Sequence, residues 1–190
     1  MIWGVTLVLL SGVLGGLTGP RVGEGRYPLR SFVTIQWAFS MLFHRIALFF
    51  LPKLVPSFIG TLYYRLSGAK IGKGCQLNTE NVNDCKSVII GNNVVINDNT
   101  SLGTTGFGFD LKIRGSSNLN PQIGIVFIDD NVHIGASCTI DRGSIGDTVI
   151  GANTFLDNQV HMAHNVKIGK NCMIAGQVGF AGSSTLGNNV

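Results

Sequence analysis

The chain lacks the cysteine patterns that mark disulfide frameworks and metal sites. Its four cysteines (Cys75, Cys85, Cys138 and Cys172) show no CxxC spacing, so buried, reduced thiols in a reducing compartment are expected. Charged residues are also scarce, at 13% of the 190 residues, whereas 45% are hydrophobic. A chain of this length and composition can build one core, or one core plus an appendage.

Acidic residues are almost missing from the first third of the chain. Residues 1–70 carry seven Lys and Arg against a single acid, Glu24, whereas residues 71–190 carry seven against nine. The net charge of +4 therefore belongs to the apolar N-terminal part. This distribution favours attraction to a membrane surface over nucleic-acid binding.

A six-residue repeat dominates the C-terminal part. Every sixth residue from Ile150 onward is large and apolar: Ile150, Leu156, Met162, Ile168, Ile174, Phe180 and Leu186. A period of six fits neither an amphipathic helix nor a simple alternating strand. It predicts a hexapeptide solenoid, in which three six-residue faces make a triangular coil and the coils stack. We expect the abundant glycines to supply positive φ at the corners.

The repeat predicts an all-β fold, a parallel β-helix over residues 67–190. It is irregular over residues 78–89 and is interrupted by a loop excursion at residues 103–127, rich in Gly, Phe, Ser and Asn. A smaller excursion lies within residues 141–149. The chain stops at Val190 in mid-hexad. Because solenoids usually end in a capping segment, we expect the chain to be truncated there.

The first twenty residues contain no charged side chain. They approach the roughly 20 residues needed to span a bilayer, and they lack the leading positive charge and the small-residue cleavage site of a signal peptide. A membrane anchor is therefore favoured. Arg21, Arg26 and Arg30 follow this stretch, and would place the rest of the chain in the cytoplasm if it spans.

Residues 31–66 form a second apolar stretch, which two prolines break. One or two helices lying in the membrane interface fit this pattern, with Trp37, Tyr63 and Tyr64 near the lipid headgroups. Helices packed on the open end of the solenoid are an equal alternative. Residues 1–66 are thus expected to be an apolar, helical, membrane-associated segment.

Among the histidines, His164 is the candidate catalytic residue. It lies two residues after a hexad anchor, so we expect it on a face or an edge, with Asp157 on the neighbouring hexad. An imidazole there can act as a general base near pH 7, although spacing alone favours an ordinary surface histidine. His161 and His133 precede anchors and are expected in solvent, and His44 indicates an interface.

The sequence disfavours both a zinc site and a nucleotide site. His161 and His164 are three residues apart, and a solenoid turn does not bring such a pair together as a helix does. The Gly106–Phe109 segment is not followed by a phosphate-binding pattern. We expect no metal site and no nucleic-acid partner.

A succession of short motifs runs along residues 103–190. In order, they are Phe107-Gly108-Phe109, Pro121-Gln122-Ile123-Gly124, Thr139-Ile140-Asp141-Arg142-Gly143, Asp157-Asn158-Gln159, Ala163-His164-Asn165 and Ala181-Gly182-Ser183. This succession closely resembles the UDP-3-O-acylglucosamine N-acyltransferases of lipid A biosynthesis, within the hexapeptide-repeat acyltransferase superfamily.

The resemblance implies a left-handed β-helix, a homotrimer and a bacterial enzyme on the cytoplasmic side of the inner membrane. The apolar N-terminal segment adds the expectation of an anchor through residues 1–60. The enzyme's reaction would move a (3-hydroxy)acyl chain to the 2-amino group of a UDP-3-O-acylglucosamine. The donor would be an acyl carrier protein, whose phosphopantetheine arm holds the chain, and no other cofactor is implied.

The resemblance also implies site residues. His164 corresponds to the general base, and the backbone N–H of Gly182 to the oxyanion donor. Asp157 and Asn158 would line the site, with Gln177 near the sugar or the pantetheine arm. Because an amine can attack a thioester without a covalent enzyme intermediate, one base, one oxyanion donor and good positioning suffice.

The N-terminal half departs from this family. Residues 1–102 do not resemble its uridine-binding domain, and residues 31–100 look more like membrane-associated or sugar-modifying hexapeptide transferases. Two alternatives therefore stay open: an acetyl-CoA-dependent sugar O-acetyltransferase, and a non-catalytic hexapeptide scaffold.

Overall fold

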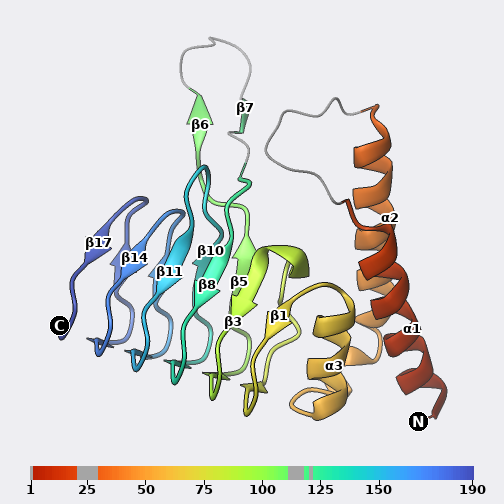
Figure 1. The fold of residues 1–190 in the computed structure, drawn as a ribbon, viewed down its shortest axis with the longest axis horizontal. Coiled ribbons are helices and arrows are strands. Elements are labelled where there is room, and N and C mark those ends of the chain that lie inside the picture. The colour runs from red at the N-terminus through yellow and green to blue at the C-terminus, as the bar shows by residue number, and fades with distance from the viewer. Residues whose placement is uncertain (1, 21–29, 111–117, 120–121) are drawn as a thin grey trace.

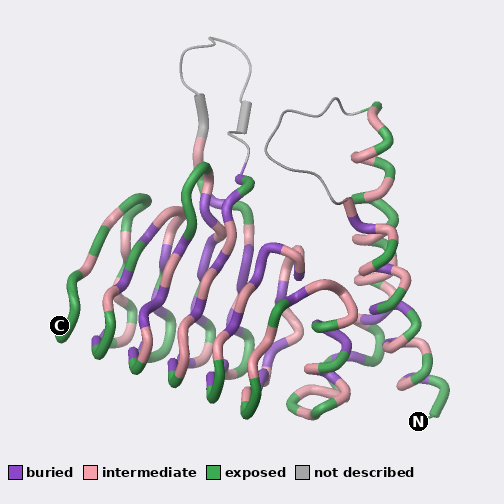
Figure 2. The backbone as a smooth tube through the Cα atoms, in the orientation of Figure 1, coloured by how far each residue is buried: buried purple, intermediate pink, exposed green. Residues whose placement is uncertain are grey.

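A computed structural model describes residues 2–20, 30–110, 118–119 and 122–190. It consists of a helical N-terminal part followed by a parallel β-solenoid (Figure 1). Buried segments run through the coils of the solenoid, whereas exposed segments are frequent on the first two helices (Figure 2).

Three parallel sheets form the three faces of the solenoid. Face A has the order β1 (Lys70–Ile71), β3 (Val88–Ile90), β8 (Val126–Ile128), β11 (Thr148–Ile150), β14 (Lys167–Ile168) and β17 (Thr185–Leu186). Face B has the order β2 (Gln76–Leu77), β4 (Val95–Ile96), β9 (His133–Ile134), β12 (Phe155–Leu156) and β15 (Met173–Ile174). Face C has the order β5 (Ser101–Thr104), β10 (Thr139–Asp141), β13 (His161–Met162) and β16 (Gly179–Phe180).

The chain visits the faces in the order A, B, C, so each coil has three corners. The first corner joins face A to face B, the second joins B to C, and the third joins C back to A. In the coil that contains His164, these corners are residues 151–154, 157–160 and 163–166. The corners position every candidate site residue.

The hexad anchors fill the interior of the solenoid. Ile150, Leu156, Met162 and Ile168 are buried, and Phe180 and Leu186 pack partly buried against the same core. Successive coils stack in register, so that Met162 pairs with Phe180. The predicted parallel β-helix is confirmed. Cys138 and Cys172 lie inside it, on the small inward positions as expected.

The expectation that glycine supplies positive φ at the corners holds at Gly74, with φ 70°, but fails at most corners. Asn, Ser and Gln occupy these turn positions instead: Asn93, Asn99, Asn131, Ser137, Asn153, Gln159, Asn165, Asn171, Gln177, Ser183 and Asn189 all have φ between 54° and 65°. A short amide side chain tolerates this backbone conformation. At the first corner the amides of Asn153 and Asn171 also hydrogen-bond from coil to coil, at 3.1 Å.

Glycine follows the face A anchors for a different reason. A Cβ on Gly151 would lie 2.6 Å from the backbone carbonyl of Gly169 in the next coil, and a Cβ on Gly169 would lie equally close to the carbonyl carbon of Gly187. At Gly151 and Gly169 the next coil therefore leaves no room for a Cβ. These glycines set the distance between coils.

Two excursions leave the solenoid as predicted from the sequence. The longer one contains the antiparallel pair β6 (Phe109–Asp110) and β7 (Asn118–Leu119), and Figure 1 shows this pair extending away from the coils. The shorter one lies between β10 and β11. The irregular residues 78–89 hold a 3-10 turn, η2 (Cys85–Ser87), and a bridge between Val82 and Leu102 that extends face C.

The N-terminal part contains α1 (Ile2–Thr18), α2 (Phe32–Ala47), the 3-10 turn η1 (Leu51–Lys53) and α3 (Phe58–Leu66). Helix α3 contacts β1 and β2, so it packs on the N-terminal end of the solenoid. Helix α1 packs on both α2 and α3. The alternative of helices packed on the open end therefore holds for α3. None of the described helices is long and apolar enough to cross a membrane.

The expectation that Tyr63 and Tyr64 face lipid headgroups is wrong. Both side chains are at most 1% exposed. The Tyr64 hydroxyl donates to the Thr79 carbonyl at 2.6 Å, and the Tyr63 hydroxyl lies 2.7 Å from Nδ1 of His44. Because each hydroxyl has an internal partner, both rings can be buried between helices and solenoid. His44 thus marks an interface within the chain, between α2 and α3.

Candidate functional site

His164 lies at the third corner, in the turn between β13 and β14, and is half-buried. Its carbonyl accepts the N–H of Ser183 at 2.9 Å. Next to it, the Asn165 N–H donates to Oγ1 of Thr148 at 3.0 Å, and Asn165 Oδ1 accepts the N–H of Ser144 at 2.7 Å. The turn that carries His164 is thus fixed by the coils on both sides.

The imidazole of His164 lies between two glycines. A Cβ on Gly182, one coil further, would come within 2.8 Å of Nε2 and Cε1 of the ring. A Cβ on Gly106, in the long excursion, would come within 2.8 Å of the His164 Cβ and 3.1 Å of Cδ2, and within 3.2 Å of Gln122 Oε1. The ring therefore fits only because both positions lack side chains.

One ring nitrogen of His164 has no partner. Its Nδ1 is buried and makes no hydrogen bond among the residues that the structure describes. A buried imidazole nitrogen usually bonds a protein group or a bound molecule, since an unmet polar atom is costly. In neutral imidazole one nitrogen accepts and the other donates. Because Nδ1 is closed to solvent, a proton from a bound molecule would reach the ring at Nε2.

Gly182 presents its backbone beside this ring. The following amide, that of Ser183, is bound to the His164 carbonyl. For the Gly182 N–H itself, no acceptor is found within the described part of the chain. A backbone N–H that is fixed and unused can stabilise negative charge that develops on a neighbouring oxygen. The geometry is compatible with the predicted role of Gly182.

Asp157 and Asn158 lie at the second corner, not beside His164. Asp157 Oδ1 accepts the N–H of Asn158 at 2.8 Å, and its Oδ2 faces Gly176 in the next coil. Asn158 Oδ1 accepts the N–H of Ala136 in the preceding coil at 2.8 Å. Gln177 lies at the same corner, where its amide donates to Gln159 Oε1 at 2.9 Å.

The five predicted site residues thus occupy two separate corners. His164 and Gly182 are at the third corner, whereas Asp157, Asn158 and Gln177 are at the second. One six-residue face separates the two corners, roughly 20 Å of extended chain. Within one copy of the chain, the two groups do not meet.

A groove of about 610 Å³ lies over face B next to the second corner. Phe155 and Met173 supply its apolar side, and Asp157 and Asn158 supply its polar end. His133 also lines it, stacked on Phe155 with ring centroids 6.3 Å apart and bonded through Nε2 to Asn97 at 3.0 Å. His133 is thus half-buried and bonded, rather than fully in solvent as expected.

Several residues near the third corner were visible in the sequence only as parts of motifs. Asp141 is 8% exposed and accepts the Thr104 hydroxyl at 2.6 Å. Arg142 forms an ion pair with Asp84, which ties this corner to the irregular segment of the first coil. Gly106 was considered only as part of a phosphate-binding pattern, because nothing in a loop sequence reveals which coil the loop folds against.

The other histidine of this region, His161, contacts a neighbouring strand and not the third corner. His161 points outward from β13, and its Nδ1 lies 2.7 Å from Oγ1 of Thr139. No group of three or more His, Cys, Asp or Glu side chains capable of holding a metal is found in the described ranges.

The motifs of this region match known proteins. The model of the family "Bacterial transferase hexapeptide (six repeats)" matches residues 147–182. Proteins named UDP-3-O-acylglucosamine N-acyltransferase are 50% identical over 96 residues in Caulobacter vibrioides and over 98 residues in Methylobacterium nodulans. These stretches cover 50% and 52% of this chain and 28% of each relative. The resemblance to UDP-3-O-acylglucosamine N-acyltransferases is confirmed.

The resemblance covers half of the chain, and the chain spans 28% of the length of these two curated relatives. A third relative of the same name, from Rhizobium johnstonii, is 50% identical over 96 residues and is covered to 27%. All three are named acyltransferases, and all come from bacteria. Among solved structures, serine acetyltransferase 1 of Entamoeba histolytica in complex with L-cysteine is 16% identical over 96% of this chain and 62% of that chain. Its TM-score of 0.26 supports no inference.

Proposed function

We propose that the chain carries the solenoid of an N-acyltransferase that acts on a UDP-3-O-acylglucosamine. The observation that supports this most is the His164 ring held between Gly106 and Gly182, with a buried Nδ1 that lacks a partner. The ring lies within residues 147–182, which match the hexapeptide transferase family model, and 96 residues of the chain are 50% identical to an enzyme of that name.

His164 is the base in this proposal. It takes the proton from the 2-amino group of the sugar as the nitrogen attacks the thioester carbonyl of the acyl donor. The N–C bond forms, the carbonyl oxygen becomes negative, and the Gly182 N–H stabilises this charge. When the oxyanion collapses, the C–S bond breaks, and the thiol of the phosphopantetheine arm leaves with a proton. No covalent enzyme intermediate is needed, because positioning and one proton transfer supply the rate.

The acyl donor in this proposal is an acyl carrier protein. The groove on face B fits the part of a substrate that has an apolar chain and a polar end, since Phe155 and Met173 lie beside Asp157 and Asn158. Gln177 extends the polar side of the same corner by one coil. Either the pantetheine arm or the acyl chain matches this chemistry.

A homotrimer completes the site. Asp157 and His164 lie on different corners of one coil, so they act on one substrate only if the second corner of one copy faces the third corner of another. Three triangular prisms related by a three-fold axis satisfy this arrangement with three equal interfaces. The reaction then takes place between copies, at the cytoplasmic side of the bacterial inner membrane.

Donor competition tests the proposal. The purified chain is given UDP-3-O-acylglucosamine with an acyl-loaded carrier protein, and in parallel a sugar acceptor with acetyl-CoA. Amide formation from the carrier protein alone supports the proposal. Turnover of acetyl-CoA alone would establish the O-acetyltransferase alternative, and turnover of neither donor would favour a non-catalytic scaffold.

A further inference from the structure

Helix α1 carries its large side chains on its outer face. Trp3, Leu10, Val13 and Leu17 are exposed, Trp3 to 87%, and their spacing of three, four or seven residues places them along one side. The buried residues of the same helix are small or only moderately large: Gly4, Val8, Ser11, Gly12 and Gly15. A helix on the surface of a protein in water has the opposite arrangement, with its apolar side facing the core.

The inner face of α1 is already fully packed. A Cβ on Gly12 would lie 3.0 Å from the Tyr63 ring and 3.2 Å from Leu66 Cβ, and a Cβ on Gly4 would lie 2.8 Å from the Phe50 ring. The Ser40 hydroxyl of α2 also donates to the Gly15 carbonyl at 3.1 Å. Small residues between helices and large ones outside are the pattern of helices that pack in lipid.

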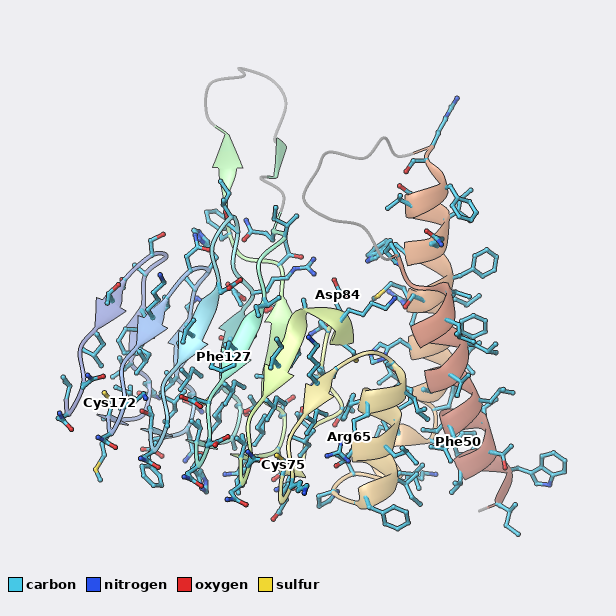
Figure 3. All side chains as sticks on the ribbon, in the orientation of Figure 1. Phe50, Arg65, Cys75, Asp84, Phe127 and Cys172 are labelled. Carbon is cyan, nitrogen blue, oxygen red and sulfur yellow. The ribbon has the colours of Figure 1, made fainter. Side chains whose placement is uncertain are left out.

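Helices α2 and α3 continue the exposed apolar surface. The exposed large side chains of α2 and the turn after it are Phe32, Ile35, Trp37, Phe39, Leu42, Phe49 and Phe50, and those of α3 are Phe58 and Leu62. Figure 3 shows aromatic rings projecting from α1 and α2 on the side away from the solenoid. On α2, Phe32, Ile35, Phe39 and Leu42 are spaced three or four residues apart and so lie along one side, whereas Trp37 lies on the opposite side and lines a cavity with Asp84 and Lys86. Monomeric soluble proteins rarely expose this much apolar surface.

The charge around this surface has one sign. The described part of residues 2–70 contains no Asp or Glu, and its five cations (Arg30, Arg45, Lys53, Arg65 and Lys70) are all exposed. A second copy of the chain on this surface would bring two sets of like charges together, which disfavours self-association through it. An anionic phospholipid surface offers both the apolar interior and the opposite charge.

We propose that the surface of α1, α2 and α3 docks on an anionic phospholipid membrane, with its apolar side chains in the interfacial layer and without crossing the bilayer. Because α3 joins these helices to the first coil, the solenoid projects from the membrane. The turn that holds His164 directly precedes β14, which lies four strand steps from β1 on face A, or roughly 20 Å. This proposal does not depend on the acyl-transfer function.

The two tryptophans of the chain, Trp3 and Trp37, both lie on these helices, and Trp3, on the exposed side of α1, is the fluorescent reporter of docking. The purified chain is titrated with vesicles of phosphatidylethanolamine and phosphatidylglycerol, and with vesicles of phosphatidylcholine alone. We expect a blue shift with the anionic vesicles, quenching by lipids brominated along the acyl chain, and weaker binding to phosphatidylcholine. The Trp37→Phe variant leaves Trp3 as the single reporter and is expected to retain the shift.

Matched variants separate docking from general effects. Arg45→Gln with Lys53→Gln should weaken partition into anionic vesicles, about fivefold for each charge removed, and Leu10→Glu with Phe39→Glu should abolish it. Lys167→Gln with Lys170→Gln, and Met173→Glu, change equally exposed residues of the solenoid and should bind as wild type.

Two results would overturn the proposal. One is the absence of any tryptophan shift with anionic vesicles. The other is a shift that develops without lipid as the protein concentration rises, because it would assign the surface to a second copy.

Discussion

The His164 ring lies so close to Gly182 of the next coil that a Cβ on residue 182 would come within 2.8 Å of Nε2. Gly182 is exposed and its φ is not among the positive values, so an alanine there strains no backbone. Its methyl group can be accommodated only if the imidazole moves. A substitution at residue 182 can therefore move the ring of the proposed base without straining the backbone of the coil that holds it.

Gly182→Ala should lower the rate of acyl transfer by about 100-fold, since a displacement of about 1 Å in a catalytic group has an effect of that size. The melting temperature should stay near that of wild type. Gly179→Ala is the matched control, because a Cβ there meets nothing within 4 Å. Steady-state rates and thermal melts of both variants make the comparison, and equal activity in the two would contradict the account.

Gly151→Ala should destabilise the solenoid by about 1–3 kcal/mol, the usual cost of overpacking. Its Cβ would lie 2.6 Å from the backbone of Gly169, whereas a Cβ on Gly187, the equivalent residue two coils later, meets nothing within 4 Å. Urea unfolding of the two alanine variants measures the difference. If both variants unfold at the same urea concentration, close coil stacking is not the reason for glycine at this corner.

Mixing two inactive variants tests whether the site is shared between copies. His164→Ala removes the third-corner group, and Asp157→Ala removes a second-corner group. If the two corners that face each other belong to different copies, then mixed trimers contain some intact sites, about one quarter under random mixing. The two proteins are unfolded together, refolded and assayed. A mixture no more active than its separately refolded components would place each site within one copy.

Burial, and secondarily the charge of Asp84, raises the pKa of the Cys85 thiol to about 12, from an ordinary value of 9.0. The folded state therefore keeps the thiol proton where the unfolded state loses it. This contribution to stability is complete below pH 9 and is lost as the pH rises towards 12, by at most about 1.4 kcal/mol per pH unit. The unfolding free energy of Cys85→Ala, measured between pH 8 and pH 11, should fall less steeply than that of wild type. Parallel slopes would show that Cys85 ionises alike in both states.

Most of the solenoid fold could be predicted from the six-residue periodicity. Ile150, Leu156, Met162 and Ile168 recur without a break in register, and only a solenoid buries every sixth residue, so the interior and its cysteines followed from spacing. The backbone conformation of the corners could not be predicted from this spacing. Asn153 and Asn171 adopt the left-handed conformation and join coil to coil, a role that composition assigns to glycine by default.

The site was only partly predictable, because a linear sequence does not order the corners in space. Asp157 and His164 are seven residues apart in the chain and were expected in one site, yet one whole face separates them. Gly106 is 58 positions before His164 and touches it, since the long excursion folds back on the third corner. Likewise, Tyr63 and Tyr64 resemble interfacial tyrosines until their hydroxyl partners, His44 and Thr79, are known.

The most direct measurement of the central claim compares His164→Ala with His161→Ala in acyl transfer from carrier protein to UDP-3-O-acylglucosamine. Both histidines flank the anchor Met162, but His161 is exposed and bonded to Thr139. Loss of the general base should cost about 10²–10⁴-fold in rate, whereas His161→Ala should remain near wild type. Equal rates in wild type and His164→Ala, with substrate turned over by both, would contradict the account.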